Sequence, residues 1–151
     1  MLPALKGFWL AGLGSTLFAA SALANSCTLS TTAVSFGNYN SFSAGDLHAN
    51  GSVTYKCTQN RAITIQLNKG SSATFNPRTM KFATDVLNYN LYMDAALTVI
   101  WGDGTGGSSF YSNSKPTTAK VTLIVYGDVP ALQQNVSAGT YTDSIVATIS
   151  F

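Results

Sequence analysis

Short segments in which apolar residues occupy every second position constrain this chain more than any other sequence feature. A period of two places the apolar side chains on one face of a β-strand. The pattern is clearest near the end of the chain, where Ile145, Ala147, Ile149 and Phe151 alternate with outward-facing residues. The same alternation predicts strands over residues 33–37, 52–57, 62–67, 86–93, 119–125 and 141–151.

Turn-forming residues separate these segments, and no segment has the 3.6-residue period of an amphipathic helix. The turn signals are Asn50-Gly51, Lys69-Gly70-Ser71-Ser72, Asn76-Pro77, Gly102-Asp103-Gly104, Ser114-Lys115-Pro116 and Ala138-Gly139. About seven short strands with frequent turns and no helices between them predict an all-β fold, an antiparallel β-sandwich. The chain after residue 24 has no linker, no low-complexity segment and no fixed repeat. We therefore expect these segments to form one domain.

The first 24 residues have the form of an export signal. Lys6 precedes an apolar run over residues 8–20, and Ala22-Leu23-Ala24 has the small-x-small form that signal peptidases accept. The run is short and interrupted by Gly and Ser, whereas a membrane-spanning helix needs about 20 apolar residues. The alternative is a buried N-terminal helix, which the absence of a polar face disfavours. We therefore expect a cleaved signal peptide over residues 1–24 and one domain over residues 25–151.

The two cysteines, Cys27 and Cys57, predict a disulfide because an isolated pair in an exported chain is normally oxidised. Closing a loop of this length stabilises the fold by about 3.5–4 kcal/mol in the chain-entropy model. The alternative is a metal site, for which two cysteines and the single histidine, His48, are a poor ligand set. We expect neither a metal ion nor another cofactor.

Charged residues are sparse, with eight Lys and Arg, six Asp and no Glu. The basic residues are scattered singly along the chain, whereas a nucleic-acid surface needs them clustered. No segment after residue 24 is long and apolar enough for stable insertion in a membrane. The sequence therefore predicts neither a nucleic-acid partner nor a membrane anchor.

The strand predicted over residues 141–151 has a consequence for function. An apolar strand at the edge of a sheet is a template for pairing with a strand from another chain. The alternative is that an internal segment of the same chain covers this edge, and the alternation pattern does not choose between the two.

Several segments, in this order and spacing, resemble the spore coat protein U domain family, which includes the subunits of archaic chaperone–usher pili. The resemblance covers nearly all of the chain after residue 24. The matching segments are Cys27, Val34-Ser35-Phe36-Gly37-Asn38-Tyr39, Gly51-Ser52-Val53-Thr54-Tyr55-Lys56-Cys57, Leu87-Asn88-Tyr89-Asn90-Leu91-Tyr92-Met93-Asp94, Trp101-Gly102-Asp103-Gly104-Thr105-Gly106-Gly107, Val125-Tyr126-Gly127-Asp128-Val129-Pro130-Ala131 and Ala138-Gly139-Thr140-Tyr141-Thr142-Asp143-Ser144-Ile145-Val146.

The resemblance implies an incomplete immunoglobulin-like β-sandwich that lacks its final strand. It also implies three partners: a periplasmic chaperone that lends a strand, an outer-membrane usher, and a neighbouring pilin subunit that replaces the chaperone strand. The protein would pass through the periplasm to a pilus on the cell surface, with a role in adhesion or biofilm formation. The edge that accepts the strand is expected to contain Tyr141, Ile145, Ala147, Ile149 and Phe151.

A subunit that donates a strand needs an extended segment ahead of its first cysteine. Cleavage after Ala24 leaves only Asn25 and Ser26 before Cys27, which is too short for a strand that rises about 3.3 Å per residue. We therefore expect a subunit that accepts a strand without donating one, at the end or tip of a fibre, or a family member that does not polymerise.

One aromatic segment is a candidate surface-contact loop. Ile100, Trp101, Phe110 and Tyr111 flank a Gly/Ser-rich stretch, and exposed aromatic side chains there could contact a surface or a sugar. The alternative, which we favour, is that Trp101 and Tyr111 pack on the sandwich and the glycines form turns. Asp103 lacks the other carboxylates of a calcium loop, so it is expected to form a turn.

Catalytic chemistry has little support. His48 lies in a polar stretch and is expected to be exposed, and the chain has no Gly-x-Ser-x-Gly nucleophile motif. We expect a protein that is not an enzyme. The alternatives to a pilus subunit are a secreted coat or matrix protein of the same fold and a small carbohydrate-binding or hydrolytic β-sandwich.

Overall fold

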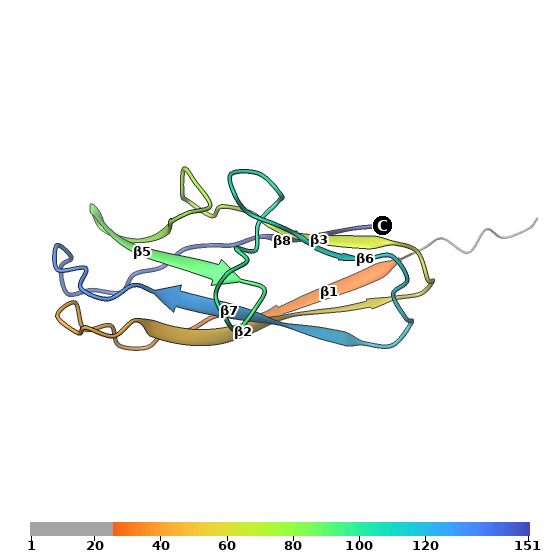
Figure 1. Ribbon diagram of the computed structural model, residues 1–151, viewed down its shortest axis with the longest axis horizontal. Helices are drawn as coiled ribbons and strands as arrows, with labels where there is room; N and C mark the ends of the chain where they lie inside the picture. Colours follow the sequence, from red (N-terminus) through yellow and green to blue (C-terminus); the bar gives the residue numbers. More distant parts are fainter. Residues whose placement is uncertain (1–25) are drawn as a thin grey trace, which may run out of the picture.

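Eight strands form the two layers of a β-sandwich in the computed structural model, which describes residues 26–151 (Figure 1). The predicted signal peptide, residues 1–24, lies outside the described residues. The strands are β1 (Cys27–Thr32), β2 (Leu47–Cys57), β3 (Ile63–Leu67), β4 (Arg78–Phe82), β5 (Asp85–Tyr92), β6 (Tyr111–Asn113), β7 (Val121–Val129) and β8 (Ala147–Ser150).

One layer has five strands in the order β1-β2-β7-β5-β4, and the other has three in the order β6-β3-β8. All the paired strands are antiparallel. The chain crosses between the layers several times, so β8 lies beside β3 although 80 positions of sequence separate Leu67 from its partner Ala147. The prediction of an all-β antiparallel sandwich is confirmed.

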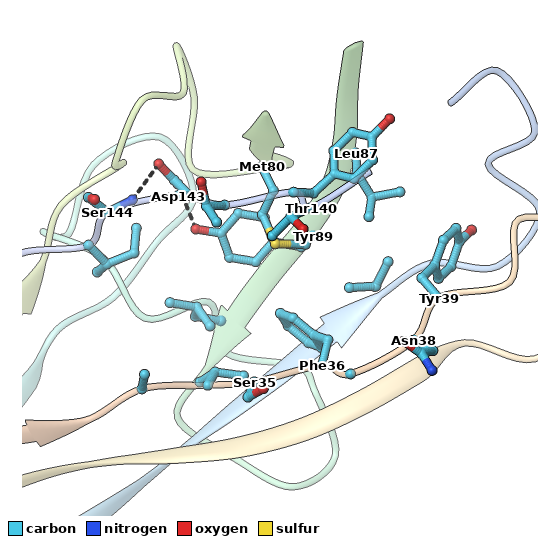
Figure 2. A pocket seen from close by; sticks show the side chains of 18 of the residues that line it. Ser35, Phe36, Asn38, Tyr39, Met80, Leu87, Tyr89, Thr140, Asp143 and Ser144 are labelled. Atoms are coloured by element: carbon cyan, nitrogen blue, oxygen red, sulfur yellow. Dashed lines mark hydrogen bonds between the residues drawn. The ribbon is translucent and has the colours of Figure 1, made fainter. Parts of the chain in front are cut away.

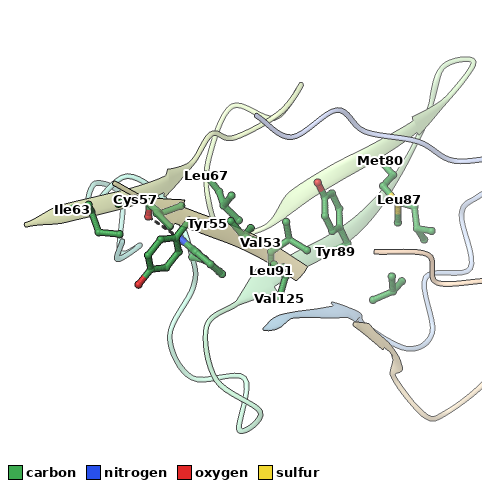
Figure 3. Close-up of a cluster of buried hydrophobic side chains, with 13 residues drawn as sticks. Val53, Tyr55, Cys57, Ile63, Leu67, Met80, Leu87, Tyr89, Leu91 and Val125 are labelled. Carbon is green, nitrogen blue, oxygen red and sulfur yellow. Dashed lines mark hydrogen bonds between the residues drawn. The ribbon is translucent and has the colours of Figure 1, made fainter. Parts of the chain in front are cut away.

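The alternating residues of the central strands form the core (Figure 3). Val53, Tyr55 and Cys57 of β2 face Ile63 and Ile65 of β3, and all of these side chains are buried. Leu67, Leu87, Tyr89, Leu91 and Val125 are buried as well. Burying a large apolar side chain stabilises a fold by about 1.5–3 kcal/mol, which is why the period-two pattern identifies these positions.

Some predicted elements differ from the observed ones. Residues 33–37 are extended but are not a strand, and the predicted final strand is confined to Ala147–Ser150. Strands β1, β4 and β6 were not expected, because none of them carries a sustained apolar alternation. Their place in the sheets depends on pairing with distant segments, such as β1 with the second half of β2.

The predicted disulfide is present and joins β1 to β2. Cys27 and Cys57 are directly opposite each other in the β1–β2 pairing. The bond therefore secures the first strand to the sheet at the end where the described chain begins.

Replacing both cysteines (Cys27→Ser with Cys57→Ser) is expected to lower the free energy of unfolding by about 3–4 kcal/mol, because the unfolded chain regains the entropy of an open loop. Urea denaturation of the oxidised wild type and of the double variant measures the difference. The reduced wild type is the matched control and should behave like the variant. An unchanged denaturation midpoint would contradict the prediction.

Within residues 26–151 there is no helix long and apolar enough to span a membrane.

Candidate functional site

An open groove runs between two segments that are far apart in the sequence but lie on either side of it (Figure 2). The first wall is formed by residues 31–42, which follow β1, and the second wall by residues 136–145 and Ala147, which lead into β8. The groove has a volume of about 1470 Å³. This volume exceeds a typical small-molecule pocket, which is about 300–1,000 Å³.

The floor of the groove is the hydrophobic core itself. It consists of side chains from both layers, namely Val53, Leu67, Met80, Leu87, Tyr89, Leu91, Val125 and Val129. The inward-facing residues are less buried toward the walls of the groove. Those of the central strands are buried, whereas Leu29 of β1, Ile145 just before β8, and Ala147 and Ile149 of β8 are only half-buried. The core is therefore incompletely covered along this one line.

Both walls present a backbone edge to the groove. Strand β8 pairs with β3 on its other side, and the segment before it is bonded to β4 through Lys81 and Thr142, with N···O distances of 2.9 and 3.1 Å. Strand β1 pairs only with β2 among the described strands. Strands β1 and β8 thus each have an unpaired edge at the closed end of the groove, and the segments that extend from them along the groove offer amide and carbonyl groups to an additional strand.

Two glycines allow the first wall to lie close to the sheet. A Cβ atom on Gly51 of β2 would lie 2.8 Å from Val34 Cγ2, and one on Gly127 of β7 would lie 2.7 Å from Val34 Cγ1. Phe36, two residues later, packs edge-to-face on Tyr89 with ring centroids 6.1 Å apart. Residues 33–37 are therefore held by side-chain packing rather than by pairing, and this explains why the predicted strand is absent.

A polar contact links the floor to the second wall. The Tyr89 hydroxyl donates to Asp143 Oδ2 at 2.7 Å, and the backbone amides of Ser71 and Ser144 donate to Asp143 Oδ1 at 2.9 Å each (Figure 2). Burial, together with this hydrogen bond, raises the pKa of the Tyr89 phenol far above its usual range. Tyr89 therefore stays protonated and holds the second wall in place as a hydrogen-bond donor.

Three of the five residues predicted for the accepting edge line the groove, namely Tyr141, Ile145 and Ala147. Ile149 packs against the core next to β3, and Phe151 is exposed, so neither lines the groove. That any of these residues contacts a partner strand stays a prediction. Sequence reasoning missed the first wall as part of the site, although it predicted an alternating segment over residues 33–37.

At the candidate surface-contact loop, the structure agrees with the favoured alternative, in which Trp101 and Tyr111 pack on the sandwich. Ile100 and Trp101 are buried, and the Trp101 indole donates to the Ile65 carbonyl at 3.0 Å, so neither side chain can contact a surface. Tyr111 lies in β6 with its hydroxyl 3.2 Å from that of Tyr55. Only Phe110 is exposed, at 40%.

A buried arginine, which sequence reasoning did not single out, fixes this loop. Arg78 is fully buried and donates to the carbonyls of Asn68 and Trp101 at 3.0 and 2.6 Å and to Asn90 Oδ1 at 2.9 Å. The guanidinium also lies 5.1 Å from the centre of the Phe75 ring. Burial lowers the pKa of Arg78 from its ordinary value, and nearby Tyr89, Asp143 and Asp103 oppose this change.

The remaining candidates have local partners. His48 is exposed, as expected, and its Nδ1 lies 3.1 Å from Asp128 Oδ1 on the directly opposite position of β7. Burial raises the pKa of Asp128, and His48 opposes this rise. Asp103 accepts from the amide and hydroxyl of Thr105 at 2.9 and 2.7 Å, which is the turn chemistry predicted for it.

Comparisons with known proteins agree on one family. A family model described as the spore coat protein U domain matches residues 14–148. Protein U of Myxococcus xanthus is 39% identical over 132 residues, which cover 78% of this chain and 71% of that protein.

Among solved structures, the fold is similar to a chain in the CsuC–CsuE chaperone–tip adhesion subunit pre-assembly complex from the archaic chaperone–usher Csu pili of Acinetobacter baumannii. The TM-score is 0.61 at 22% identity, and the match covers 85% of this chain. It spans only 40% of the length of the matched chain. At this identity, the likeness establishes the shared fold.

Proposed function

Because this chain belongs to the spore coat protein U domain family, we propose that it is a structural, non-enzymatic subunit of a surface pilus built by the chaperone–usher pathway. The groove between residues 31–42 and residues 136–147 carries the proposal. It combines an apolar floor with two sheet edges, which is the arrangement that an added β-strand requires.

Strand addition accounts for both features of the groove, the free backbone edges and the apolar floor. Backbone amides and carbonyls of the incoming strand pair with the free edges, and its alternate side chains fill the groove and pack on the apolar floor. Burying about four apolar side chains of the incoming strand in the groove stabilises the fold by roughly 6–12 kcal/mol. This is comparable to the whole stability of a domain, about 5–15 kcal/mol, so the incoming strand would be a large part of the fold.

The proposed partners follow from this mechanism. A periplasmic chaperone would fill the groove first, an outer-membrane usher would receive the complex, and the strand of a neighbouring pilin would then replace that of the chaperone. The fold shared with a subunit crystallised in a chaperone complex supports the first of these partners. The protein would reach the cell surface and act there in adhesion or biofilm formation.

A terminal or tip position is the finer part of the proposal. It rests on the predicted cleavage after Ala24, which leaves two residues before Cys27. N-terminal sequencing of the exported protein tests it, because a mature chain that starts well before Ala22 would restore a donor segment.

Co-purification from the periplasm tests the main proposal. The chain, co-expressed with the chaperone that serves it, is expected to elute as a one-to-one complex. Amide hydrogen exchange should then slow at residues 33–37 and 140–147, while residues 111–113 of β6 serve as the unaffected control. A stable free monomer without chaperone-dependent protection would contradict the proposal.

The spore coat description of the family favours a second candidate, a secreted coat or matrix protein of the same fold. The two candidates differ in assembly. A coat protein would not require an usher, so deleting the usher would leave its export unchanged, whereas a pilus subunit would be retained in the periplasm.

A further inference from the structure

Two loops at one end of the molecule expose large apolar side chains. Phe42, in the loop between β1 and β2, is 72% exposed, and Leu132, in the loop after β7, is 53% exposed. Figure 1 shows both loops at the end opposite the C-terminus. Together the two side chains are named the pole patch.

The loops that carry the pole patch are bonded to each other. The Leu132 amide donates to the Ser43 carbonyl, next to Phe42, at 3.2 Å. Leu132 has a φ of 58°, a left-handed conformation that residues other than glycine and asparagine rarely adopt. Such conformations persist where the surroundings enforce them and are concentrated at functional sites. The structure thus holds Leu132 in an unfavourable conformation that exposes its side chain.

A second set of hydrogen bonds makes this end rigid. The Tyr39 hydroxyl donates to the Pro130 carbonyl at 2.8 Å and accepts from the Gln133 amide at 3.0 Å. The Gln133 side chain in turn accepts from the Asn88 amide at 2.7 Å and donates to the Asn88 carbonyl at 3.0 Å, as a neighbouring strand would. Phe42 and Leu132 are therefore presented from a fixed framework.

The two loops at this end also have no charged side chains. Residues 37–45 and 130–140 contain no Lys, Arg, Asp, Glu or His. The adjacent Asp46 accepts a hydrogen bond from the Ala131 amide at 2.8 Å, so its carboxylate is engaged within the loops. Interface centres are depleted in charge and enriched in aromatic residues, so a partner surface at this end would be apolar and uncharged.

The pole patch is continuous with the groove. Phe42 lines the groove at the end of the first wall, and Val136 begins the second wall four residues after Leu132. At the other end, beyond Thr31 and Ala147, β1 and β8 come into contact. A strand that occupies the groove therefore has its open exit at the pole patch, and the folded domain connected to that exit would lie there.

We propose that Phe42 and Leu132 dock the folded body of the subunit whose strand fills the groove, so that recognition includes the body as well as the strand. This inference rests on the proposed function. The occupant is a second domain of this fold that carries its strand immediately before its own β1. Its contact would fix the angle between successive subunits in addition to strengthening their binding.

Two probes separate the strand from the body. The first is a synthetic ten-residue peptide of alternating valine and threonine. The second is the same sequence placed before Ser26 in a second copy of this chain, whose own groove is filled by a tethered strand. The variant is Leu132→Asn, since asparagine tolerates the left-handed backbone and Leu132, unlike Phe42, does not line the groove. Ile124→Thr, which removes another exposed apolar side chain on β7, is the matched control.

In the wild type, the two-domain probe is expected to bind at least tenfold more tightly than the peptide. Leu132→Asn should bind the peptide as the wild type does and lose most of the advantage for the two-domain probe, while Ile124→Thr retains it. If both probes bind equally to the wild type, or Leu132→Asn keeps the advantage, docking at the pole patch is refuted. If neither probe binds the wild type, the proposed function fails, and this inference fails with it.

Discussion

A chain with a complementary strand tethered to its C-terminus is expected to unfold about 20 °C above the free chain. The tether is a flexible linker after Phe151, and the strand is ten residues of alternating valine and threonine. Its valines would cover the groove floor, which includes Met80, Leu87 and Leu91. The gross gain is about 6–12 kcal/mol, and ordering the strand removes part of it.

The temperature estimate uses the lower end of that range. For a domain of this size, 1 kcal/mol shifts the midpoint of thermal unfolding by about 3–4 °C, so about 6 kcal/mol corresponds to roughly 20 °C. Differential scanning calorimetry measures both midpoints. The free chain is expected to unfold at low temperature or to aggregate, because the groove is unfilled and its apolar wall residues, such as Ile145 and Ala147, are only half-buried.

The matched control carries the same tether with aspartate in place of each valine. It preserves the linker and the backbone but places charges against the apolar floor, so it should stabilise the chain little. Equal stabilisation by both tethers would mean that the groove does not recognise an apolar strand. A high, concentration-independent midpoint for the free monomer would show that the fold is complete without one.

Much of this fold was predictable because it depends on local alternation. The buried faces of β2, β3 and β5 follow directly from Val53-x-Tyr55-x-Cys57, Ile63-x-Ile65-x-Leu67 and Leu87-x-Tyr89-x-Leu91. A period of two is the geometric signature of one buried strand face, whatever the strand pairs with. The disulfide was predictable for a different reason, since only two cysteines are present.

The groove was predictable only in part, because its geometry depends on distant residues. Residues 33–37 alternate like a strand, but the glycines at 51 and 127 decide where they lie. The Trp101 side chain is buried because Arg78, 23 residues earlier, donates to its carbonyl and orders its loop. Contacts of this kind leave no periodic signal, so the sequence pattern alone placed Trp101 and Ile100 among the candidates for a surface contact.

A single charge in the groove is expected to abolish strand binding, and its sequence neighbour supplies the control. Ile145 lines the groove from the second wall, whereas Val146 is 57% exposed on the opposite face of the same segment. Ile145→Asp would place a carboxylate against an apolar partner strand, which is costly without a compensating hydrogen bond. We expect binding of the tethered or free strand to weaken at least about 100-fold, equivalent to about 2.7 kcal/mol.

Val146→Asp introduces the same charge one position away and should weaken strand binding by less than about threefold, since its side chain points to solvent. Isothermal titration with the ten-residue peptide measures both variants, and circular dichroism of each shows whether it remains folded. Because successive side chains of an extended segment point to opposite faces, only a partner that lies in the groove can distinguish the two positions. Similar losses for both variants would place the partner elsewhere, and a folded Ile145→Asp chain that still binds the peptide tightly would refute the groove as the binding site.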